Sequence, residues 1–341
     1  MTDRLSQDEL PVSRQELQQR QLEHLQMVLN RAAKNVSYYH DLFKGCGFLP
    51  QDFESLEGLP RIPLTRRETI LERQPYGMLA VPPHDVVRIH TALGPDGHPI
   101  VVAFTENDIR YWALLSARAL RRARITRDDA VYIALDYGQS VEGLGVHYGA
   151  ETIGATVIPR TNTVIADQLA VMKNYRASVL VGTPSYLLQL VHHMEKEGFD
   201  PKTLFLRSVF LVGEPCPEMV RRRITSSLFV NAYFIYGLDE ILNPGIASEY
   251  ADQDSLLVNE DHFILEIVDP EGDSPRPHGQ TGELVVTTLT REAVPLIRYR
   301  TGELASLQEI MREDGRKALA LRPKGQRVDD MVVVGVAKFY P

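Results

Sequence analysis

Three short runs of β-branched and aliphatic residues set the fold: Val131-Tyr-Ile-Ala-Leu135, Thr156-Val-Ile158 and Ser178-Val-Leu-Val-Gly182. The stretches between them, near 143–153 and 163–175, space their apolar residues as a helix does. Strands that alternate with helices build βαβ units and a parallel sheet. The segments that extend this series are Val86–His90, Ile100–Phe104, the helix Glu106–Arg121, Ser208–Val212 and Ala232–Ile235. The sequence therefore predicts an α/β core.

The residues on either side of this core have a different pattern. Ser13 with Glu16 three residues later is a capping-box pattern, which predicts a helix over 13–34. After about residue 250 helical spacing gives way to strands at hairpin spacing, which predicts an antiparallel sheet or a small barrel. The expected parts are a helical lead-in at 1–85, an α/β core at 86–250, and a β-rich subdomain at 251–341.

The composition is that of an ordinary globular protein. Of the 341 residues, 44% are hydrophobic and 24% charged, which excludes dominant disorder, collagen-like repetition and coiled coil. Lys and Arg number 37 against 45 Asp and Glu, so a net charge of −8 offers no general attraction to nucleic acid or an anionic membrane. The spacing of Cys46 and Cys216 argues against a disulfide framework and a thiolate zinc site. With no export signal or membrane span in the sequence, we expect a cytoplasmic protein.

Glycines follow the expected strand Val131–Leu135 in the order Gly143-Leu-Gly145-Val-His-Tyr-Gly149. Three residues separate the last two glycines, whereas a dinucleotide fingerprint has two. A dinucleotide fingerprint also needs an acid about 20 residues further on, at a strand end. The acid nearest that position, Asp167, falls within an expected helix. Close packing of helices explains these glycines better than a nicotinamide site does.

Three other motifs place glycine beside a carboxylate or an aromatic ring at or after a strand: Val212-Gly-Glu-Pro215, Tyr236-Gly-Leu-Asp-Glu240 and Gly282–Glu303. This combination suits a nucleotide, because an aromatic ring can stack on a base and a carboxylate can bind ribose hydroxyls or Mg²⁺. Each motif also has a structural interpretation. A Tyr-Gly pair is often a turn with a packed ring, and Arg298 and Arg300 with Glu303 can form a surface salt-bridge set.

In their order along the chain, these motifs resemble those of the phenylacetate–CoA ligase family, within the adenylate-forming superfamily. The other segments that carry the resemblance are Tyr38-Tyr39, Leu59-Pro60, Tyr76–Pro82, Arg88–His90, Gly143–Glu151, Gly154–Pro159 and Thr183–Tyr186. The likeness covers residues from about 37 to 341, and chance is a poor explanation for the run Gly282–Glu303. It implies the α/β large domain of an adenylate-forming enzyme, with mixed and parallel sheets flanked by helices and a β-rich C-terminal part.

The resemblance also implies a reaction and a set of site residues. A carboxylate would attack the α-phosphate of Mg²⁺·ATP to give an acyl-adenylate and pyrophosphate, and the coenzyme A thiol would then attack the activated carbonyl. The implied positions are Gly213, Glu214 and Pro215 at adenine, Tyr236 beside Gly237 stacked on the base, Glu240 on Mg²⁺ as a catalytic residue, Glu303 on the ribose, and Arg327 in the hinge motif.

The phosphate loop departs from the family pattern S-S-G-T-T-G-K-P. Here Ala92-Leu-Gly-Pro-Asp-Gly-His-Pro99 keeps the glycines, Gly94 and Gly97, but loses the hydroxyls and the lysine. Pro95 has no N–H to donate, and Asp96 would repel a triphosphate. His98 stands in the place of the lysine and carries only a fractional charge near neutral pH. We therefore expect weak ATP binding, with His98 as a candidate catalytic residue.

The expected acyl pocket departs as well. Its segment is Asp136-Tyr-Gly-Gln-Ser-Val-Glu-Gly143, in place of G-Y-G-L-F-T-G-G. The implied pocket residues are Tyr137, Gly138, Ser140 and Gly143. Serine at 140 enlarges the space, while Gln139 and Glu142 add polar groups. A larger or polar-substituted aromatic carboxylate is therefore expected, unless Gln139 and Glu142 face solvent at the rim.

Pro341 falls at the family's hinge, so the small C-terminal domain is expected to be absent. Two alternatives to a complete ligase follow: an atypical homologue that hands an acyl-adenylate to a partner enzyme, and a non-catalytic ligand-binding protein. A homodimer is compatible with each of them. Adjacent Asp329 and Asp330 point to opposite faces of a strand, and His192-His193 suits a solvated helix face, so neither pair predicts a metal site.

Overall fold

The computed structural model describes residues 13–93, 98–138, 141–160, 163–250, 255–312, 315–328, 332–334 and 337–339. The chain divides into two compact units, which we call unit 1 (1–111 with 257–341) and unit 2 (112–256). The helical N-terminal part and the β-rich C-terminal part therefore share a unit, which the three consecutive parts expected from the sequence did not anticipate. Two elements cross the unit boundaries, α4 (Glu106–Arg122) and β9 (Leu256–Val258).

Unit 2 contains the α/β series. Its elements are β3 (Ala130–Ile133), α5 (Val141–Ile153), β4 (Thr156–Pro159), α6 (Ile165–Asn174), β5 (Val179–Gly182), α7 (Pro184–Glu197), η5 (Pro201–Thr203), β6 (Ser208–Leu211), α8 (Glu218–Leu228), β7 (Asn231–Tyr236) and β8 (Ala247–Glu249). The strand order is β4-β3-β5-β6-β7-β8, in which the first five strands are parallel and β8 is antiparallel to β7. The parallel sheet predicted from these β-branched runs is confirmed.

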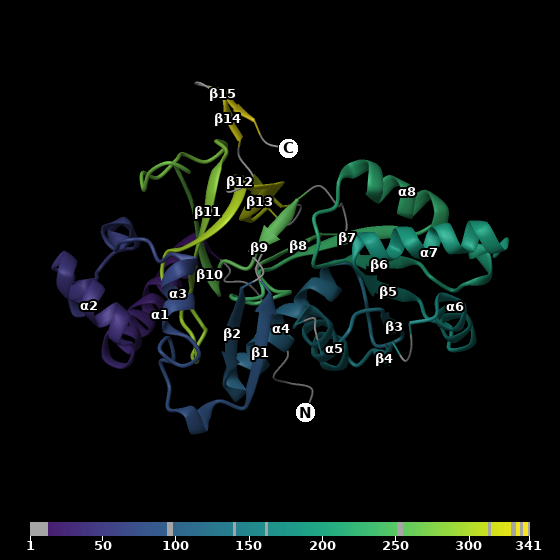
Figure 1. The fold of residues 1–341 in the computed structure, drawn as a ribbon, viewed down its shortest axis with the longest axis horizontal. Coiled ribbons are helices and arrows are strands. Elements are labelled where there is room, and N and C mark those ends of the chain that lie inside the picture. The colour runs from purple at the N-terminus through teal and green to yellow at the C-terminus, as the bar shows by residue number, and fades with distance from the viewer. Residues whose placement is uncertain are drawn as a thin grey trace. The chain divides into compact units, whose positions relative to one another are not determined.

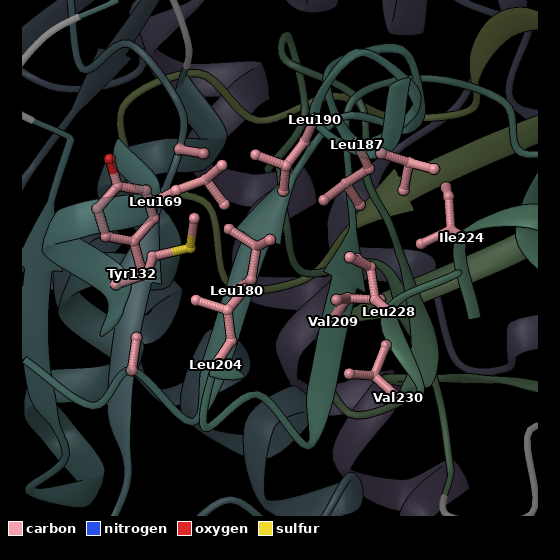
Figure 2. Packing of buried hydrophobic residues seen from close by; sticks show 14 of the residues in the cluster. Tyr132, Leu169, Leu180, Leu187, Leu190, Leu204, Val209, Ile224, Leu228 and Val230 are labelled. Carbon is pink, nitrogen blue, oxygen red and sulfur yellow. The ribbon is translucent and has the colours of Figure 1, made fainter. Parts of the chain in front are cut away.

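Both faces of this sheet are covered by helices, because alternate residues of each strand face opposite sides. Leu180 packs with residues of α6, α7 and α8, whereas its neighbours Val179 and Val181 pack with α4 and α5. Figure 2 shows the first cluster, in which Leu180 lies beneath Leu187 and Leu190 of α7. Figure 1 shows α7 and α8 lying together over the strands of this unit.

The glycines of α5 are explained by packing. A Cβ atom on Gly145 would lie 2.4 Å from Nε1 of Trp112, and one on Gly149 would lie 2.5 Å from Cβ of Ser116, both in α4. Only glycine permits two helices to approach this closely. Asp167 lies inside α6, as expected. The packing interpretation of the 143–149 motif is therefore the correct one.

Unit 1 holds the N-terminal helices and the antiparallel strands. Its elements are α1 (Arg14–Asn35), α2 (Ser37–Cys46), η2 (Pro50–Asp52), η3 (Leu56–Arg61), α3 (Arg67–Arg73), η4 (Pro83–Asp85), β1 (Arg88–Leu93), β2 (Pro99–Phe104), β10 (Phe263–Val268), β11 (Gly282–Thr288), β12 (Tyr299–Met311), β13 (Lys317–Arg327), β14 (Val332–Val334) and β15 (Ala337–Phe339). Strands β10 to β13 pair in sequence order as an antiparallel sheet, one of the two arrangements expected.

The placement of the first two strands in the parallel series is wrong. β1 and β2 pair with each other, antiparallel, in a two-stranded sheet of their own. Only five residues, 94–98, join them, and a parallel connection needs a crossover of about a dozen residues or more. The β-branched pattern identified the strands, but the short connection sets their direction.

The predicted N-terminal helix is confirmed. Ser13 is its N-cap and accepts a hydrogen bond from the Glu16 backbone N–H at 3.1 Å. α1 ends at Asn35, and a second helix, which the sequence did not predict, begins two residues later. No helix in the described part of the chain combines the length and the apolar character needed to cross a membrane.

Candidate active site

Most of the predicted site residues of unit 2 lie at the carboxyl ends of its parallel strands. Tyr137 follows β3, Gly213 follows β6 and Gly237 follows β7. The carboxyl ends of parallel strands meet at one edge of a sheet, where α/β proteins bind their ligands. The parallel order of the strands brings these three positions to the same edge.

Glu214 is held by the N-terminus of α7. Its carboxylate accepts hydrogen bonds from the Ser185 backbone N–H at 3.0 Å and from the Ser185 hydroxyl at 2.7 Å. A carboxylate is favoured at a helix N-terminus, where backbone N–H groups have no partner within the helix. This contact joins the segments that follow β5 and β6 and fixes the path of Gly213–Pro215. Gly213 and Pro215, on either side of Glu214, are exposed.

Tyr236 and Gly237 match the structural interpretation of their motif. Tyr236 is only 6% exposed at the end of β7. A Cβ atom on Gly237 would lie 2.6 Å from the backbone O of Leu242, so the turn after β7 requires glycine. Packing thus accounts for both residues, and the base-stacking role of Tyr236 stays a prediction.

Two acidic side chains at this edge share one amide. Asn243 donates both Nδ2 hydrogens, one to Oε1 of Glu142 at 2.9 Å and one to Oδ1 of Asp239 at 2.8 Å. Glu142 lies in the first turn of α5 and is only 8% exposed. The alternative in which Glu142 faces solvent at a rim is therefore wrong, because its carboxylate is buried against Asn243. Gln139 lies outside the described residues.

The environment of Asp239 favours its neutral form. The pKa of Asp239 is raised to about 7, mainly by burial and then by the negative charges of Glu142 and Glu240. The hydrogen bond from Asn243 acts in the opposite direction and lowers it. A buried carboxyl close to another carboxylate binds a proton more readily. Asp239 was not predicted as a site residue, although it lies in the quoted motif beside Glu240. The Glu142 charge that raises its pKa comes from a residue far away in the sequence.

Tyr137 begins a hydrogen-bonded chain that also involves α5. Its hydroxyl lies 2.9 Å from Nδ1 of His147, and Nε2 of His147 lies 3.2 Å from a carboxylate oxygen of Glu151. Glu151 can only accept, so the neutral imidazole carries its proton on Nε2 and accepts from Tyr137 at Nδ1. Burial, with the charge of Glu151, raises the pKa of Tyr137. His147 and Glu151 were not predicted as site residues.

Other residues of the expected acyl pocket have simple local roles. A Cβ atom on Gly143 would lie 3.0 Å from Cδ1 of Tyr137, so glycine lets the tyrosine ring lie against α5. The Gly138 backbone N–H donates to Asp136 Oδ1 at 2.8 Å and closes the turn after β3. Ser140, the fourth predicted pocket residue, lies outside the described residues.

In unit 1, two of the predicted nucleotide residues are neighbours. Glu303 of β12 and Arg327 of β13 are register partners in the antiparallel pair, and both are partly exposed. The backbone N–H of Glu303 donates to the Thr301 hydroxyl at 3.0 Å. The preceding Gly302 has φ +74°, and its N–H donates to Glu283 at 3.0 Å. The turn before Glu303 is therefore fixed by its neighbours.

The interpretation of Arg298, Arg300 and Glu303 as a surface salt-bridge set is wrong. Arg298 is 2% exposed and pairs with Glu266 at 2.9 Å, while Arg300 pairs with the buried Glu283. Arg298 also donates to the backbone O of Ile62 at 2.6 Å. The two arginines thus form buried salt bridges within unit 1.

The phosphate loop is described only at its end. Gly94 and Gly97 lie outside the described residues, as do Asp329 and Asp330. His98 is exposed, and its backbone O accepts a hydrogen bond from Arg67 of α3 at 2.7 Å. Gln74, which follows α3, donates to the Pro99 backbone O at 2.9 Å and accepts from the Val101 N–H at 3.1 Å. Nothing in the sequence pattern indicated that Arg67 and Gln74 support this loop.

Within the described residues, no group of three or more His, Cys, Asp or Glu side chains could hold a metal ion. Mg²⁺ does not require such a cage, because it is commonly bound by one or two carboxylates together with substrate phosphates. Glu240, half-buried in the turn after β7, can serve in that way. Its carboxylate fits a Mg²⁺ that arrives with ATP, and not one held by the protein alone.

Residues 79–290 match the family model of the AMP-binding enzymes. The chain is 40% identical over 326 residues to the phenylacetate-coenzyme A ligase of Pseudomonas putida, with 95% of this chain and 74% of that protein covered. The chain belongs to the phenylacetate–CoA ligase family of AMP-binding enzymes. The Escherichia coli ligase of the same name is 38% identical over 96% of this chain and 74% of its own length. The crystal structure of 2-hydroxyisobutyryl-CoA ligase with 2-HIB-AMP is 25% identical, with a TM-score of 0.89 over 97% of this chain and 72% of that chain.

Proposed function

We propose that this protein activates an aromatic carboxylate with ATP and transfers the acyl group to coenzyme A. The observation that carries the proposal is the 40% identity to a phenylacetate-coenzyme A ligase across 95% of the chain. The arrangement of unit 2 agrees with it, because the motifs that the family uses for nucleotide and acyl group follow β3, β6 and β7 at one edge of the parallel sheet.

The reaction has two balanced steps. A carboxylate oxygen of the acid bonds to the α-phosphorus of ATP, and the bond to pyrophosphate breaks to give an acyl-adenylate. The coenzyme A sulfur then bonds to the acyl carbon, its thiol proton is lost, and AMP leaves with the electron pair of the C–O bond. Negative charge that builds up on phosphoryl oxygens must be met by cations and N–H donors.

The residues of unit 2 take the following proposed roles. Gly213, Glu214 and Pro215 line the adenine, with Glu214 held by Ser185 so that the segment keeps its path. Glu240 holds Mg²⁺ together with phosphate oxygens, and this ion supplies charge neutralisation at the phosphates. Tyr236 and Gly237 form the edge of the base site. Tyr137, Gly138, Ser140 and Gly143 border the acyl group, with Tyr137 oriented by His147.

In unit 1, Glu303 binds the ribose hydroxyls and Arg327 acts beside it. His98 supplies part of the charge that a lysine provides in the family, while Arg67 holds the backbone of His98 in place. Gly94 and Gly97 offer backbone N–H groups to phosphate. We expect weaker phosphate binding than the family's lysine gives, because the flexible lysine ammonium is the stronger phosphate ligand.

A coupled assay over a panel of aryl acids tests the proposal. The purified chain is incubated with ATP, Mg²⁺ and coenzyme A, while pyrophosphate and thioester are measured separately. Release of both supports a ligase. Pyrophosphate without thioester would assign the second step to a partner enzyme. If none of the acids leads to pyrophosphate release, the proposed activation is overturned. A Glu240→Gln variant is the control, because it removes the proposed Mg²⁺ ligand while keeping the side-chain volume.

A further inference from the structure

The proposed function leaves the buried amide of Asn243 unexplained. Its two hydrogens go to Glu142 and Asp239, at 2.9 and 2.8 Å. Its Oδ1 has no hydrogen-bond partner among the described residues, although the side chain is only 5% exposed. A flipped amide would turn Oδ1 towards the carboxylate of Glu142, which cannot donate, so the orientation with Nδ2 facing the two acids is favoured. A buried acceptor without a donor is destabilising, and such atoms in native proteins call for an explanation.

The backbone of two glycines lies directly against two of these acceptor atoms. A Cβ atom on Gly237 would lie 2.7 Å from Asn243 Oδ1, and one on Gly213 would lie 2.8 Å from Glu142 Oε1. Both glycines belong to the motifs assigned to the nucleotide and lie at the carboxyl edge of the parallel sheet. The acceptor atoms therefore lie against the loops where substrate binding is proposed.

The neighbouring tyrosine adds another acceptor. In the neutral form of His147, the Tyr137 hydroxyl donates its hydrogen to Nδ1. Its remaining lone pair can only accept from a ligand. The Tyr137 ring lies against Gly143, one residue after Glu142 in α5. This corner of unit 2 thus presents Glu142, Asp239, the Asn243 carbonyl and the Tyr137 oxygen as acceptors.

We propose that Glu142, Asp239 and Asn243 form a subsite for an amino group carried by the aromatic carboxylate. The inference rests on the proposed function and narrows its substrate class. An amino group brings two hydrogens, or three when protonated, which can reach the two carboxylates and Asn243 Oδ1. A hydroxyl brings one, and an unsubstituted ring brings none and would leave the acids desolvated. Sites built to bond a polar substituent reject analogues that lack it.

The test is equilibrium binding of 2-, 3- and 4-aminophenylacetate, 4-hydroxyphenylacetate and phenylacetate, measured by titration calorimetry without ATP. The wild-type chain should bind one amino isomer at least about tenfold more tightly than phenylacetate. Glu142→Gln and Asp239→Asn keep the side-chain volumes and should each reduce that preference to about threefold or less. Glu197→Gln, at the exposed end of α7, is the matched control and should leave the preference unchanged.

Phenylacetate binding as tightly as every amino isomer would overturn the subsite, as would an unchanged preference in a folded Glu142→Gln or Asp239→Asn variant. Tightest binding of the hydroxy acid would overturn the choice of an amino group. The acid panel on the wild-type chain decides the matter even if both variants unfold. Because binding is measured without turnover, it is independent of pyrophosphate release. Turnover of phenylacetate without a preference for an amino isomer would overturn only the subsite. A preference for an amino isomer without turnover would overturn only the proposed reaction.

Discussion

Glu303 of β12 and Arg327 of β13 are direct cross-strand partners in the antiparallel pair. Side chains of directly opposed residues have Cβ atoms about 4.5–5.5 Å apart, so an acid and a base placed in this way lie within reach of each other. Both side chains are partly exposed. The pair therefore combines the proposed ribose ligand with Arg327, the arginine of the expected hinge motif, on a single stretch of sheet.

Replacing Glu303 by alanine should weaken ATP binding with little loss of stability. Removing a charged hydrogen-bond partner from a ligand costs about 1.5–3 kcal/mol, so KM for ATP should rise by roughly 10- to 100-fold. The melting temperature should change little, since the side chain is not buried. Steady-state kinetics at varied ATP provides the measurement. Glu309→Ala, an exposed acid in the same strand, is the control, and equal KM values in the two variants would contradict the ribose role.

Asp239→Asn should change the pH dependence of stability. The pKa of Asp239 is raised to about 7, so between about pH 4 and 7 the folded chain binds a proton that the unfolded chain releases. This contribution to stability is complete below pH 4 and is lost as the pH rises through 7. The variant should therefore melt roughly 3 °C or more above the parent at pH 8, with most of this gain lost at pH 4.5.

Thermal melts of both proteins across this pH range make the comparison. Asp128→Asn, an exposed aspartate, should follow the parent at every pH. A gain for Asp239→Asn that is constant with pH would show that Asp239 titrates normally in the folded chain.

Gly145→Ala should disturb the packing of α5 on α4. Its Cβ atom would lie 2.4 Å from Nε1 of Trp112, which also donates to the Pro244 backbone O at 3.1 Å. Overpacking of this kind costs about 1–3 kcal/mol of unfolding free energy. Trp112 is the only tryptophan in the sequence, so its fluorescence reports both the local change and the denaturant midpoint. Gly45→Ala, in α2 with open space around it, should be neutral, and equal midpoints would show that α5 can shift without cost.

Arg67→Ala should raise KM for ATP by about tenfold and leave the melting temperature nearly unchanged. Arg67 donates to the backbone O of His98 at 2.7 Å and so holds the end of the phosphate loop. A charge-assisted hydrogen bond of this kind is worth about 1.5–3 kcal/mol. Arg61→Ala, at the exposed end of η3, is the control. An unchanged KM would assign Arg67 no part in loop position.

The parallel sheet of unit 2 was predictable because buried strands between helices are short β-branched runs. Helix α8 was missed because only Ile224 and Leu228 of its residues are buried, too few for a clear helical pattern. The direction of β1 and β2 depends on the length of their connection and not on their side chains. Local pattern therefore identified strands more reliably than their pairing.

The candidate site was predictable only where a short motif carries it, as in Gly213–Pro215 and Tyr236–Glu240. The contact of Asn243 with Glu142 joins residues 101 positions apart, and no local spacing indicates it. Burial of Glu142 depends on how the loop after β7 returns to the first turn of α5. Such long-range polar contacts are set by tertiary packing, and the rim alternative failed for that reason.

The most direct test of the proposed function measures pyrophosphate and acyl-CoA formation by the wild-type chain with ATP, Mg²⁺ and coenzyme A across phenylacetate and its amino derivatives. We expect release of pyrophosphate that depends on an aryl acid, with thioester formed in equal amount and the highest kcat/KM for an amino-substituted acid. No pyrophosphate release with any aryl acid, from protein that melts cooperatively, would contradict the proposed function.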